Sequence, residues 1–392
     1  MRLAVVTSHP VQYYAPLFRA LARQVDLTVF YGYQPRPSDQ AAAGFGVGFE
    51  WDIDLTTGYR AQWLENRARH PGLAGFAGIS TPRIGEQLRD GKFDAVLLIG
   101  WHKKFLLQAL FAAKRLGLPV LMRGDSHLQT PRSLLKRMAK ELAYPVFLRQ
   151  FDAALAVGEL NRAYWQHYHF PAVRIFASPH CVDAAWFADR ATPEARTELR
   201  ARLGIAPAVP TALFAGKLVE FKRPLQLVEA ASRVRRAGVP VELLVAGDGP
   251  LRQAMTDHAA ALGLRLHMLG FCNQSQMPVA YAAADVLVLP SDGRESWGLV
   301  ANEALACGTP ALVADNVGCA PDLARLLGDQ VVFAGGNVDS LVDRLGGVLH
   351  CPPTRDAIAA ANRAFSLSAA VSGIVAAMVS LTIPAGDVDD RG

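Results

Sequence analysis

The sequence predicts an α/β protein made of two doubly wound, Rossmann-like domains. Short apolar runs alternate with helical patterns along the first half of the 392 residues, and the alternation starts again in the second half. Strands that alternate with helices form parallel sheets covered by helices, so two such series indicate two domains. A boundary stretch rich in Ala, Arg, Glu and Pro follows the first series. We place the domains at residues 1–190 and 191–364, with a C-terminal helix at 365–383 and a disordered tail at 384–392.

The N-terminal domain is expected to contain six strands. Apolar runs of strand length occur at residues 3–6, 27–30, 95–99, 119–122, 152–157 and 174–178. Polar residues that follow the first, third and fourth of these runs are His9, His102, Asp125 and His127. Ligands bind at the carboxyl ends of parallel strands, so these four are candidate cleft residues. The glycine-rich dinucleotide fingerprint is absent after the first run, which argues against NAD binding there.

Residues 35–80 are rich in Gly, Pro and aromatic residues and have weak periodicity. Such composition is typical of long loops that bind a ligand. Within them, Asp52-Ile-Asp54 imitates a metal-binding Asp-x-Asp pair, but two matching residues make a weak motif. The alternation of polar and apolar residues over 50–55 favours a strand edge instead.

Positive charge is concentrated in the N-terminal half. Residues 1–190 contain 23 Lys and Arg against 15 Asp and Glu, whereas residues 191–392 contain 17 against 20. This favours an anionic partner such as nucleic acid, an acidic glycan or a phospholipid surface, although an ordinary basic protein has the same composition.

Residues 131–149 form a basic amphipathic stretch. Five basic residues accompany a single acidic one, Glu141, with apolar residues between them: Arg132, Lys136, Arg137, Lys140 and Arg149. One interpretation is peripheral contact with an anionic membrane. The interpretation we favour is a surface helix whose apolar side packs on the sheet. Aromatic residues are not interleaved as in proteins that bind single-stranded nucleic acid, so no nucleic-acid partner is expected.

The C-terminal domain repeats the alternation, with strands expected at residues 211–215, 241–246, 264–269, 285–290 and 311–314. The uncharged segment 364–383 has the length of a membrane span. Its many alanines, one glycine and the serines on one helical face dilute its hydrophobicity. We therefore favour a helix packed on the protein.

The stretch from residue 291 to 310 joins an apolar strand to a helix that is expected to begin just after Gly298. The free N–H groups of a first helical turn bind anions. Glu295 and Glu303 are eight residues apart, a little over two helical turns, so both carboxylates are expected on nearly the same face. Carboxylates accept hydrogen bonds from hydroxyls. Phosphate together with hydroxyls indicates a nucleotide sugar.

Lys217 and Lys222 lie in the loop after the strand at 211–215, at the same sheet edge. Two ammonium groups beside a helix N-terminus can bind a diphosphate and stabilise its charge as a leaving group. No carboxylate cluster suited to a divalent cation accompanies them, so a metal-independent reaction is predicted. In isolation such lysines are more often solvated loop residues, and the neighbouring helix and glutamates favour the site.

Composition bounds the remaining possibilities. With 51% hydrophobic residues the chain can bury a sizeable core. The five cysteines are scattered and odd in number, which fits a reducing compartment better than a disulfide framework or zinc site. The N-terminal apolar run is too short for a signal peptide. We therefore expect a cytoplasmic protein, peripheral at the inner face of the membrane if residues 131–149 bind lipid.

Several motifs of the C-terminal half resemble those of retaining GT-B glycosyltransferases of family 4. The stretch from Glu295 to Pro310 resembles the E-x7-E region of that family. Phe214 to Leu218, with Lys222, resembles its Gly-Arg-Leu…Lys segment, Lys217 standing in place of the usual arginine. Further similarities are Ala246-Gly-Asp-Gly-Pro250, Leu269-Gly-Phe271, Cys181-Val-Asp183 with Phe187, and Phe365-Ser-Leu367. The resemblance covers most of residues 178–382, whereas residues 1–170 match mainly in layout.

The resemblance implies the GT-B fold, in which two domains face a cleft and the terminal helix crosses back to the first domain. It implies a retaining glycosyltransferase that uses a UDP- or GDP-linked sugar and no cofactor, with a glycan, lipid-linked or small-molecule acceptor held by the N-terminal domain. Lys217 and Lys222 would bind the diphosphate, and Glu295 the sugar hydroxyls. The remaining donor contacts would be Gly216, Gly270, Phe271, Trp297, Gly298, Leu299 and Glu303, the last on the ribose.

Two departures from the family pattern leave alternatives open. Many members have a glycine pair after the first strand, where this chain has Ser8-His-Pro10. Many have a histidine after the strand matching 119–122, where this chain has Arg123-Gly-Asp125. Either His102 or His127 takes over that function, or the function is absent. The alternatives are an inactive nucleotide-sugar-binding scaffold, or a sugar epimerase or phosphorylase of the same fold.

Overall fold

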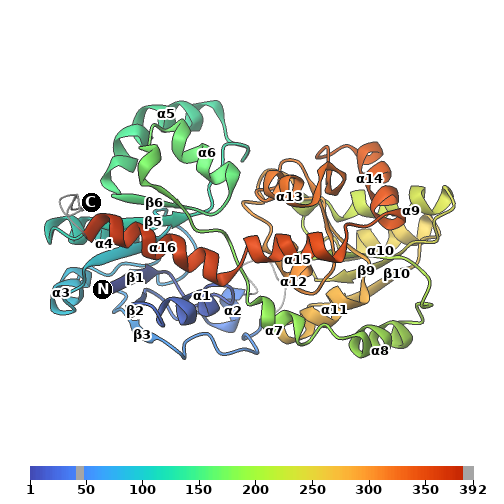
Figure 1. Cartoon of the computed structure of the whole chain (residues 1–392), viewed down its shortest axis with the longest axis horizontal. Coiled ribbons are helices and arrows are strands. Elements are labelled where there is room, and N and C mark those ends of the chain that lie inside the picture. The colour runs from blue at the N-terminus through green and yellow to red at the C-terminus, as the bar shows by residue number, and fades with distance from the viewer. Residues whose placement is uncertain (41–47, 383–392) are drawn as a thin grey trace, which may run out of the picture.

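The computed structural model describes residues 1–40 and 48–382, which form two α/β domains side by side (Figure 1). The tail expected at residues 384–392 lies outside the described residues, as does the last residue of the helix expected at 365–383. The described residues form one sheet of seven strands and one of six, and every strand pair is parallel. The predicted fold class is confirmed.

The N-terminal sheet has the order β3-β2-β1-β4-β5-β6-β7. Its strands are β1 (Arg2–Thr7), β2 (Asp26–Tyr31), β3 (Arg60–Trp63), β4 (Ala95–Ile99), β5 (Val120–Gly124), β6 (Ala153–Ala156) and β7 (Ile175–Ala177). Its helices are α1 (Tyr14–Leu21), α2 (Pro37–Gln40), α3 (Ile84–Asp90), α4 (Lys104–Arg115), α5 (Leu134–Phe147) and α6 (Glu159–His167). The central strands are buried on both faces, which is why they read as continuous apolar runs in the sequence.

Residues 48–59 form a loop, so the strand edge predicted at residues 50–55 is wrong. The Asp54 carboxylate accepts hydrogen bonds from the backbone N–H groups of Thr56 (2.9 Å) and Thr57 (3.2 Å), and this turns the chain instead of extending it. The edge strand is β3, further along the chain, which pairs with β2. Because residues 48–59 do not pair in the sheet, this loop can contact the second domain.

The C-terminal sheet has the order β10-β9-β8-β11-β12-β13. Its strands are β8 (Thr211–Ala215), β9 (Glu242–Ala246), β10 (Leu266–Gly270), β11 (Val286–Leu289), β12 (Ala311–Ala314) and β13 (Val332–Phe333). Its helices are α7 (Ala184–Ala188), α8 (Pro193–Leu203), α9 (Pro224–Arg236), α10 (Arg252–Ala261), α11 (Met277–Ala283), α12 (Leu299–Ala306), α13 (Ala320–Leu327), α14 (Val338–His350) and α15 (Arg355–Ala364). The order places the loops after β8 and β11 next to each other, because these two strands are neighbours.

The last helix, α16 (Leu367–Thr382), returns to the N-terminal domain and lies against α1 and β7 (Figure 1). Gly373 permits the close approach, since a Cβ there would be 1.7 Å from the carbonyl oxygen of Ala177. The Ser178 hydroxyl donates to the carbonyl of Ala370 (3.0 Å). By length and composition alone, the described segment Arg355–Thr382, which combines α15 and α16, could span a membrane. The prediction of a packed helix is confirmed, because α16 buries one face on the first domain.

Helix α5 lies at the outer edge of the N-terminal domain (Figure 1), and its apolar side faces solvent. The expectation that this side packs on the sheet is wrong. The packed side consists of Tyr144 and Phe147, which rest on the core, whereas Leu135 and Leu142 are exposed. The aromatic side chains occupy the packed side because they bury more apolar surface than the aliphatic ones.

Candidate active site

The loops after β8 and β11 bring three predicted residues together. The ammonium group of Lys222 forms an ion pair with the carboxylate of Glu295, and the Ser291 hydroxyl donates to the same carboxylate (3.0 Å). The side chains of Lys222 and Glu295 are only 12% and 15% exposed. A charge pair so nearly removed from water is held in a fixed position, which suits the binding of a charged ligand.

Lys217 adds a second positive charge to the cluster formed by Lys222 and Glu295. Burial lowers the pKa of Lys217, and the charge of Lys222 lowers it further. Gly216 has φ of +137°, a backbone conformation that residues other than glycine rarely adopt. The backbone of Gly247 also passes close to Gly216. Glycine is therefore needed where the two loops approach the lysines.

Helix α12 begins at Leu299, immediately after Gly298, as the sequence predicts. Gly298 has φ of +95°, and a Cβ there would be 2.6 Å from the side chain of Leu289. The glycine thus allows the sharp turn from β11 into the helix. Glu295 lies in the turn before α12, so the expectation that it shares a helical face with Glu303 is wrong. The turn instead lets Glu295 reach Lys222.

Glu303 is buried on α12, and its carboxylate accepts a hydrogen bond from the Tyr281 hydroxyl (2.6 Å). Burial raises the pKa of Glu303 to about 7, and the hydrogen bond from Tyr281 partly offsets that effect. A buried carboxylate with unused acceptor capacity is suited to hold hydroxyl groups of a ligand.

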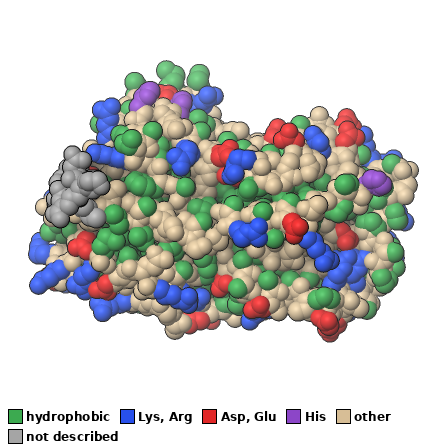
Figure 2. Space-filling model, in the orientation of Figure 1, with side chains coloured by type: hydrophobic (Ala, Val, Ile, Leu, Met, Phe, Trp, Pro, Cys, Tyr) green, Lys and Arg blue, Asp and Glu red, His purple; other side chains and the backbone are tan. Residues whose placement is uncertain are grey.

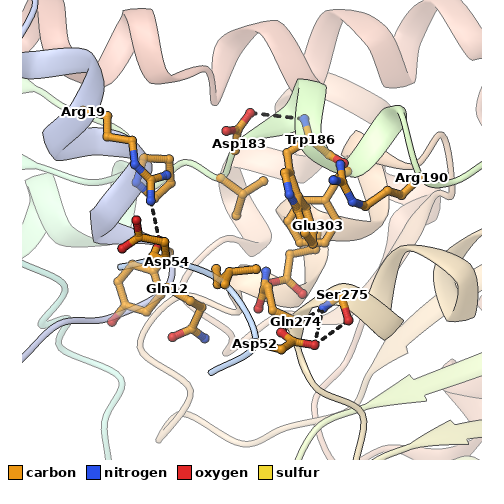
Figure 3. Close-up of a pocket in the computed structure, with 15 residues that line it drawn as sticks. Gln12, Arg19, Asp52, Asp54, Asp183, Trp186, Arg190, Gln274, Ser275 and Glu303 are labelled. Atoms are coloured by element: carbon orange, nitrogen blue, oxygen red, sulfur yellow. Dashed lines mark hydrogen bonds between the residues drawn. The ribbon is translucent and has the colours of Figure 1, made fainter. Parts of the chain in front are cut away.

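Glu303 lines a cavity of ≈ 320 Å³ between the two domains (Figure 3). Figure 3 shows Arg19 and Asp54 on one side of this cavity and Arg190 on the other, with Asp52 and Ser275 below. Lys217, Lys222 and Glu295 do not line it. The predicted residues thus form two adjoining groups, joined by α12. One contains the charged side chains of Lys217, Lys222 and Glu295, and the other contains Glu303, whose carboxylate can accept hydrogen bonds from hydroxyls.

The loop that contains Asp52 lines this cavity, within residues 35–80, for which the composition predicts ligand-binding loops. The backbone N–H of Ser275 donates to the Asp52 carboxylate (3.2 Å), and the Asn273 amide donates to the carbonyl of Glu50 (2.8 Å). The Phe49 ring lies 4.3 Å from that of Phe271, centroid to centroid. Phe271, predicted to contact a base together with Gly270, therefore lies against a loop of the other domain. Its contacts with the second domain join residues far apart in the sequence, so the local alternation around Asp52 does not predict them.

Asp125 and His127 connect the first domain to the loop after β11. The Ser296 hydroxyl donates to the Asp125 carboxylate (2.6 Å). His127 is buried beside the backbone of Glu295, and burial lowers its pKa. Gly293 makes this approach possible, since a Cβ there would be 2.5 Å from the carbonyl oxygen of Gln129. These two cleft candidates lie next to the predicted charge cluster.

His9 and His102 lie at the same edge of the first sheet, and burial and the positive charge of Lys103 lower the pKa of both. Burial lowers the pKa of His9 to about 4, and its ring shares a hydrogen bond with the Ser8 hydroxyl (2.8 Å). His102 is exposed, with its ring 3.2 Å from where a Cβ of Gly100 would lie. At neutral pH His9 is therefore an uncharged hydrogen-bonding group.

Trp297 also has a structural role, in addition to the donor contact that its motif implies. Its indole N–H donates to the side-chain oxygen of Asn302 (2.8 Å), and the Asn302 amide donates to the carbonyl of His180 (2.9 Å). Its ring lies 5.6 Å from that of Phe365, centroid to centroid. The residue therefore fills the junction where the chain crosses between the domains.

Within residues 1–40 and 48–382, no group of three or more His, Cys, Asp or Glu side chains is placed to hold a metal ion.

Two facing Rossmann-like domains with a terminal helix crossing back define the GT-B class. A crystal structure of a glycosyltransferase from Rickettsia africae is similar over 98% of this chain and 99% of its own, with a TM-score of 0.72 and 14% sequence identity. This likeness shows the fold.

Residues 195–365, most of the second domain, match the family described as Glycosyl transferases group 1. A relative from Corynebacterium glutamicum is 28% identical over 62% of this chain and 62% of its own length. That relative is named a GDP-mannose-dependent monoacylated alpha-(1-6)-phosphatidylinositol monomannoside mannosyltransferase. A D-inositol 3-phosphate glycosyltransferase from Geodermatophilus obscurus is 38% identical over 38% of this chain and 34% of its own. The chain thus spans less than two thirds of the length of these relatives.

Proposed function

We propose that the chain transfers a sugar from a nucleoside-diphosphate sugar to an acceptor bound mainly by the N-terminal domain. The observation that carries this proposal is the arrangement around α12. Lys217, Lys222 and Glu295 lie beside the start of this helix, and Glu303 faces the adjoining cavity between the domains.

In the proposed reaction the two lysines hold the diphosphate. Breaking the bond between sugar and diphosphate places negative charge on the leaving group, so fixed ammonium groups stabilise the transition state more than the ground state. The N–H groups of Trp297, Gly298 and Leu299, at the start of α12, supply further donors. Lys222 exchanges part of its contact with Glu295 for the phosphate, which frees Glu295 to accept hydrogen bonds from the sugar.

Glu303 takes the ribose hydroxyls in this proposal, and the segment around Gly270 and Phe271 takes the base. Burial of Glu303 supports its assignment, because a hydroxyl bonded to a desolvated carboxylate contributes more than one bonded in water. We further propose that the reaction retains the anomeric configuration, needs no metal ion, and uses a phosphate oxygen of the leaving group as the base for the incoming hydroxyl.

The donor is proposed to be linked to GDP or UDP. The name of the C. glutamicum relative makes GDP-mannose the first donor to test, and its acceptor in that name is a lipid. We propose a glycan, lipid-linked or inositol-type acceptor for this chain. We place the enzyme in the cytoplasm, at the inner face of the membrane when the acceptor is a lipid.

The test is the release of GDP or UDP from candidate donors with and without candidate acceptors. Acceptor-dependent release with a glycosylated product is expected. Donor binding without release in any combination would instead indicate a scaffold protein. Release of nucleotide with an altered free sugar, independent of an acceptor, would indicate an epimerase.

A further inference from the structure

Five apolar side chains stand exposed on one side of α5. They are between 56% and 81% exposed: Leu134, Leu135, Met138, Leu142 and Val146. At about 100° per residue, their positions fall within an arc of about 120° around the helix axis. The stripe is about 18 Å long, since each helical residue adds about 1.5 Å. We call this set the α5 face. Figure 2 shows hydrophobic side chains, with Lys and Arg near them, along the upper edge where Figure 1 places α5.

The opposite side of α5 holds the helix firmly to the domain. Tyr144 and Phe147 pack on the core, and the Trp101 indole donates to the Tyr144 hydroxyl (3.3 Å). The Lys140 ammonium lies 4.5 Å from the centroid of the Tyr144 ring and 5.6 Å from that of Tyr164. The α5 face therefore points outward because the other side is fixed, and it keeps this orientation when the protein is in water.

Charged side chains on the rest of α5 indicate what covers the α5 face. Lys136 and Arg137 lie about 80° and 60° around the helix axis from the edges of this face, within the reach of long side chains. Lys136 and Arg137 are exposed on the helix, and Arg132 and Arg149 stand just outside its two ends. The single acidic residue of this segment, Glu141, is bonded to His167 (3.0 Å). Exposed apolar residues flanked by positive charge suit the boundary between acyl chains and anionic headgroups. A second copy of this face would bring like charges together, which opposes self-association.

The segment before α5 leads directly into the cleft. His127 lies beside Glu295, and Gln129 lies against Gly293, so the chain leaves the candidate active site only a few residues before Leu134. Five residues span at most about 18 Å. A surface bound to the α5 face would therefore lie close to the mouth of the cleft.

We propose that the α5 face binds an anionic lipid bilayer and so presents a lipid-linked acceptor to the cleft. This rests on the proposed function for the transfer step, but the binding of the bilayer itself does not. The apolar side chains enter the boundary region, and Lys136 and Arg137 contact the anionic headgroups.

The test is co-sedimentation with vesicles of phosphatidylcholine mixed with phosphatidylglycerol, compared with vesicles of phosphatidylcholine alone. The full chain should bind the mixed vesicles more tightly. The double variant Leu135→Glu/Leu142→Glu should lose at least about tenfold in affinity, because it puts two charges into the apolar boundary. The matched control is Val173→Glu, which changes an apolar side chain that is 86% exposed outside α5 and should bind as the wild type does.

A second variant tests the charges. Lys136→Glu/Arg137→Glu should weaken binding to the mixed vesicles by about tenfold or more, since each basic residue near an anionic surface contributes about a factor of five. The exposed pair Arg89→Glu/Lys92→Glu, which lies outside α5, is its control. Equal vesicle binding by the wild type and both α5 variants would overturn the proposal.

Two further outcomes separate the possibilities. If the wild type binds no vesicles but forms dimers in sedimentation velocity that Leu135→Glu/Leu142→Glu abolishes, a second copy covers the α5 face and the proposal is overturned. Donor binding is measured by the thermal shift that GDP-mannose and UDP-sugars cause. It should be the same in the α5 variants as in the wild type. Retained donor binding without vesicle binding removes the α5 proposal alone, whereas a wild type that binds and turns over no donor removes the proposed function.

Discussion

The two sides of the cleft are built differently. On the C-terminal side, charged groups are withdrawn from water and paired, as Lys222 is with Glu295 and Glu303 with Tyr281. On the N-terminal side, Asp125 is partly exposed and His102 is exposed, and α5 leaves an apolar stripe uncovered. The C-terminal groups have their partners within the protein, whereas the N-terminal groups and the α5 face are in part left to solvent.

In the proposed function, the difference follows from what each side recognises: the diphosphate on the C-terminal side and the acceptor on the N-terminal side. A diphosphate has a fixed charge and shape, so donors set in advance in a dry site stabilise it without reorganisation. Acceptors vary in size and polarity, and loops on a rigid scaffold accommodate such variation. Substitutions on the C-terminal side should therefore affect activity most, and the effect should fall toward the outer contacts between domains.

The largest effect is expected from Lys222→Ala. It removes the charge that balances the leaving diphosphate in the proposed reaction, and it leaves Glu295 without its ion-pair partner. Turnover should fall by about a hundredfold to a thousandfold, as when a fixed transition-state donor is lost elsewhere. The rate of nucleotide release at a saturating donor concentration measures this turnover.

Arg236→Ala is the matched control for Lys222→Ala. It removes an exposed cation from the surface of α9 in the same domain, and its activity should equal that of the wild type. Wild-type turnover by Lys222→Ala would show that the cluster after β8 has no part in the chemistry.

The next effect is that of Glu303→Gln on donor binding. The amide keeps the size of the side chain, but it cannot accept two strong hydrogen bonds from ribose hydroxyls. Because a hydrogen bond to a charged group contributes about 1.5–3 kcal/mol, donor affinity should fall by about tenfold to a hundredfold. Isothermal titration with the donor measures it, and Glu198→Gln on the exposed face of α8 should leave it unchanged.

The same substitution should change how stability depends on pH. The pKa of Glu303 is raised to about 7 in the folded protein. The folded state therefore holds a proton that the unfolded state has already lost, so this group costs stability as pH rises from its unfolded pKa to about 7. The cost should reach about 3 kcal/mol above that pH, at about 1.4 kcal/mol per pKa unit. Without the donor, Glu303→Gln should therefore be more stable than the wild type at pH 8 and equal near pH 4.5, in urea denaturation. The same difference at both pH values would contradict the raised pKa.

The sequence predicted the C-terminal side in detail because local chemistry determines it. A buried strand, Gly298 at positive φ and the start of α12 follow from a few neighbouring residues, and the lysines fall on the adjacent strand by sheet order. It did not show that Glu295 turns away from α12 toward Lys222, since that depends on a contact 73 residues apart.

The N-terminal side was predicted less well because its contacts join distant segments. Asp52 meets Ser275 across 223 residues, so the local alternation around Asp52 favoured a strand that does not form. In α5 the pattern gave the amphipathic helix correctly but not which side packs. Tyr144 and Phe147 occupy the packed side, and no rule of spacing distinguishes them from the leucines.

A smaller effect is expected where the two sides meet. Ser296→Ala removes the hydrogen bond from the donor-side loop to Asp125 (2.6 Å), whose carboxylate is partly exposed. Water can replace part of that bond, so kcat/KM for the acceptor should fall by only about threefold to tenfold, with donor affinity unchanged. Combining it with Asp125→Asn tests the contact directly. Two losses that simply add would show that Ser296 and Asp125 act independently.

The smallest effect is expected from Arg325→Ala, at an outer contact between the domains. The Arg325 guanidinium pairs with the Glu159 carboxylate (2.7 Å), but the two side chains are 58% and 47% exposed. Exposed pairs contribute about 0.2–1 kcal/mol and are screened by salt. The free energy of unfolding should therefore fall by less than about 1 kcal/mol, and the loss should shrink at high salt. The control is Arg67→Ala, which breaks a similarly exposed pair with Glu65 inside the first domain. A loss for Arg325→Ala well beyond that of the control, together with weaker donor binding, would mean that outer contacts help to set the closed site, and the division between the two sides of the cleft would no longer hold.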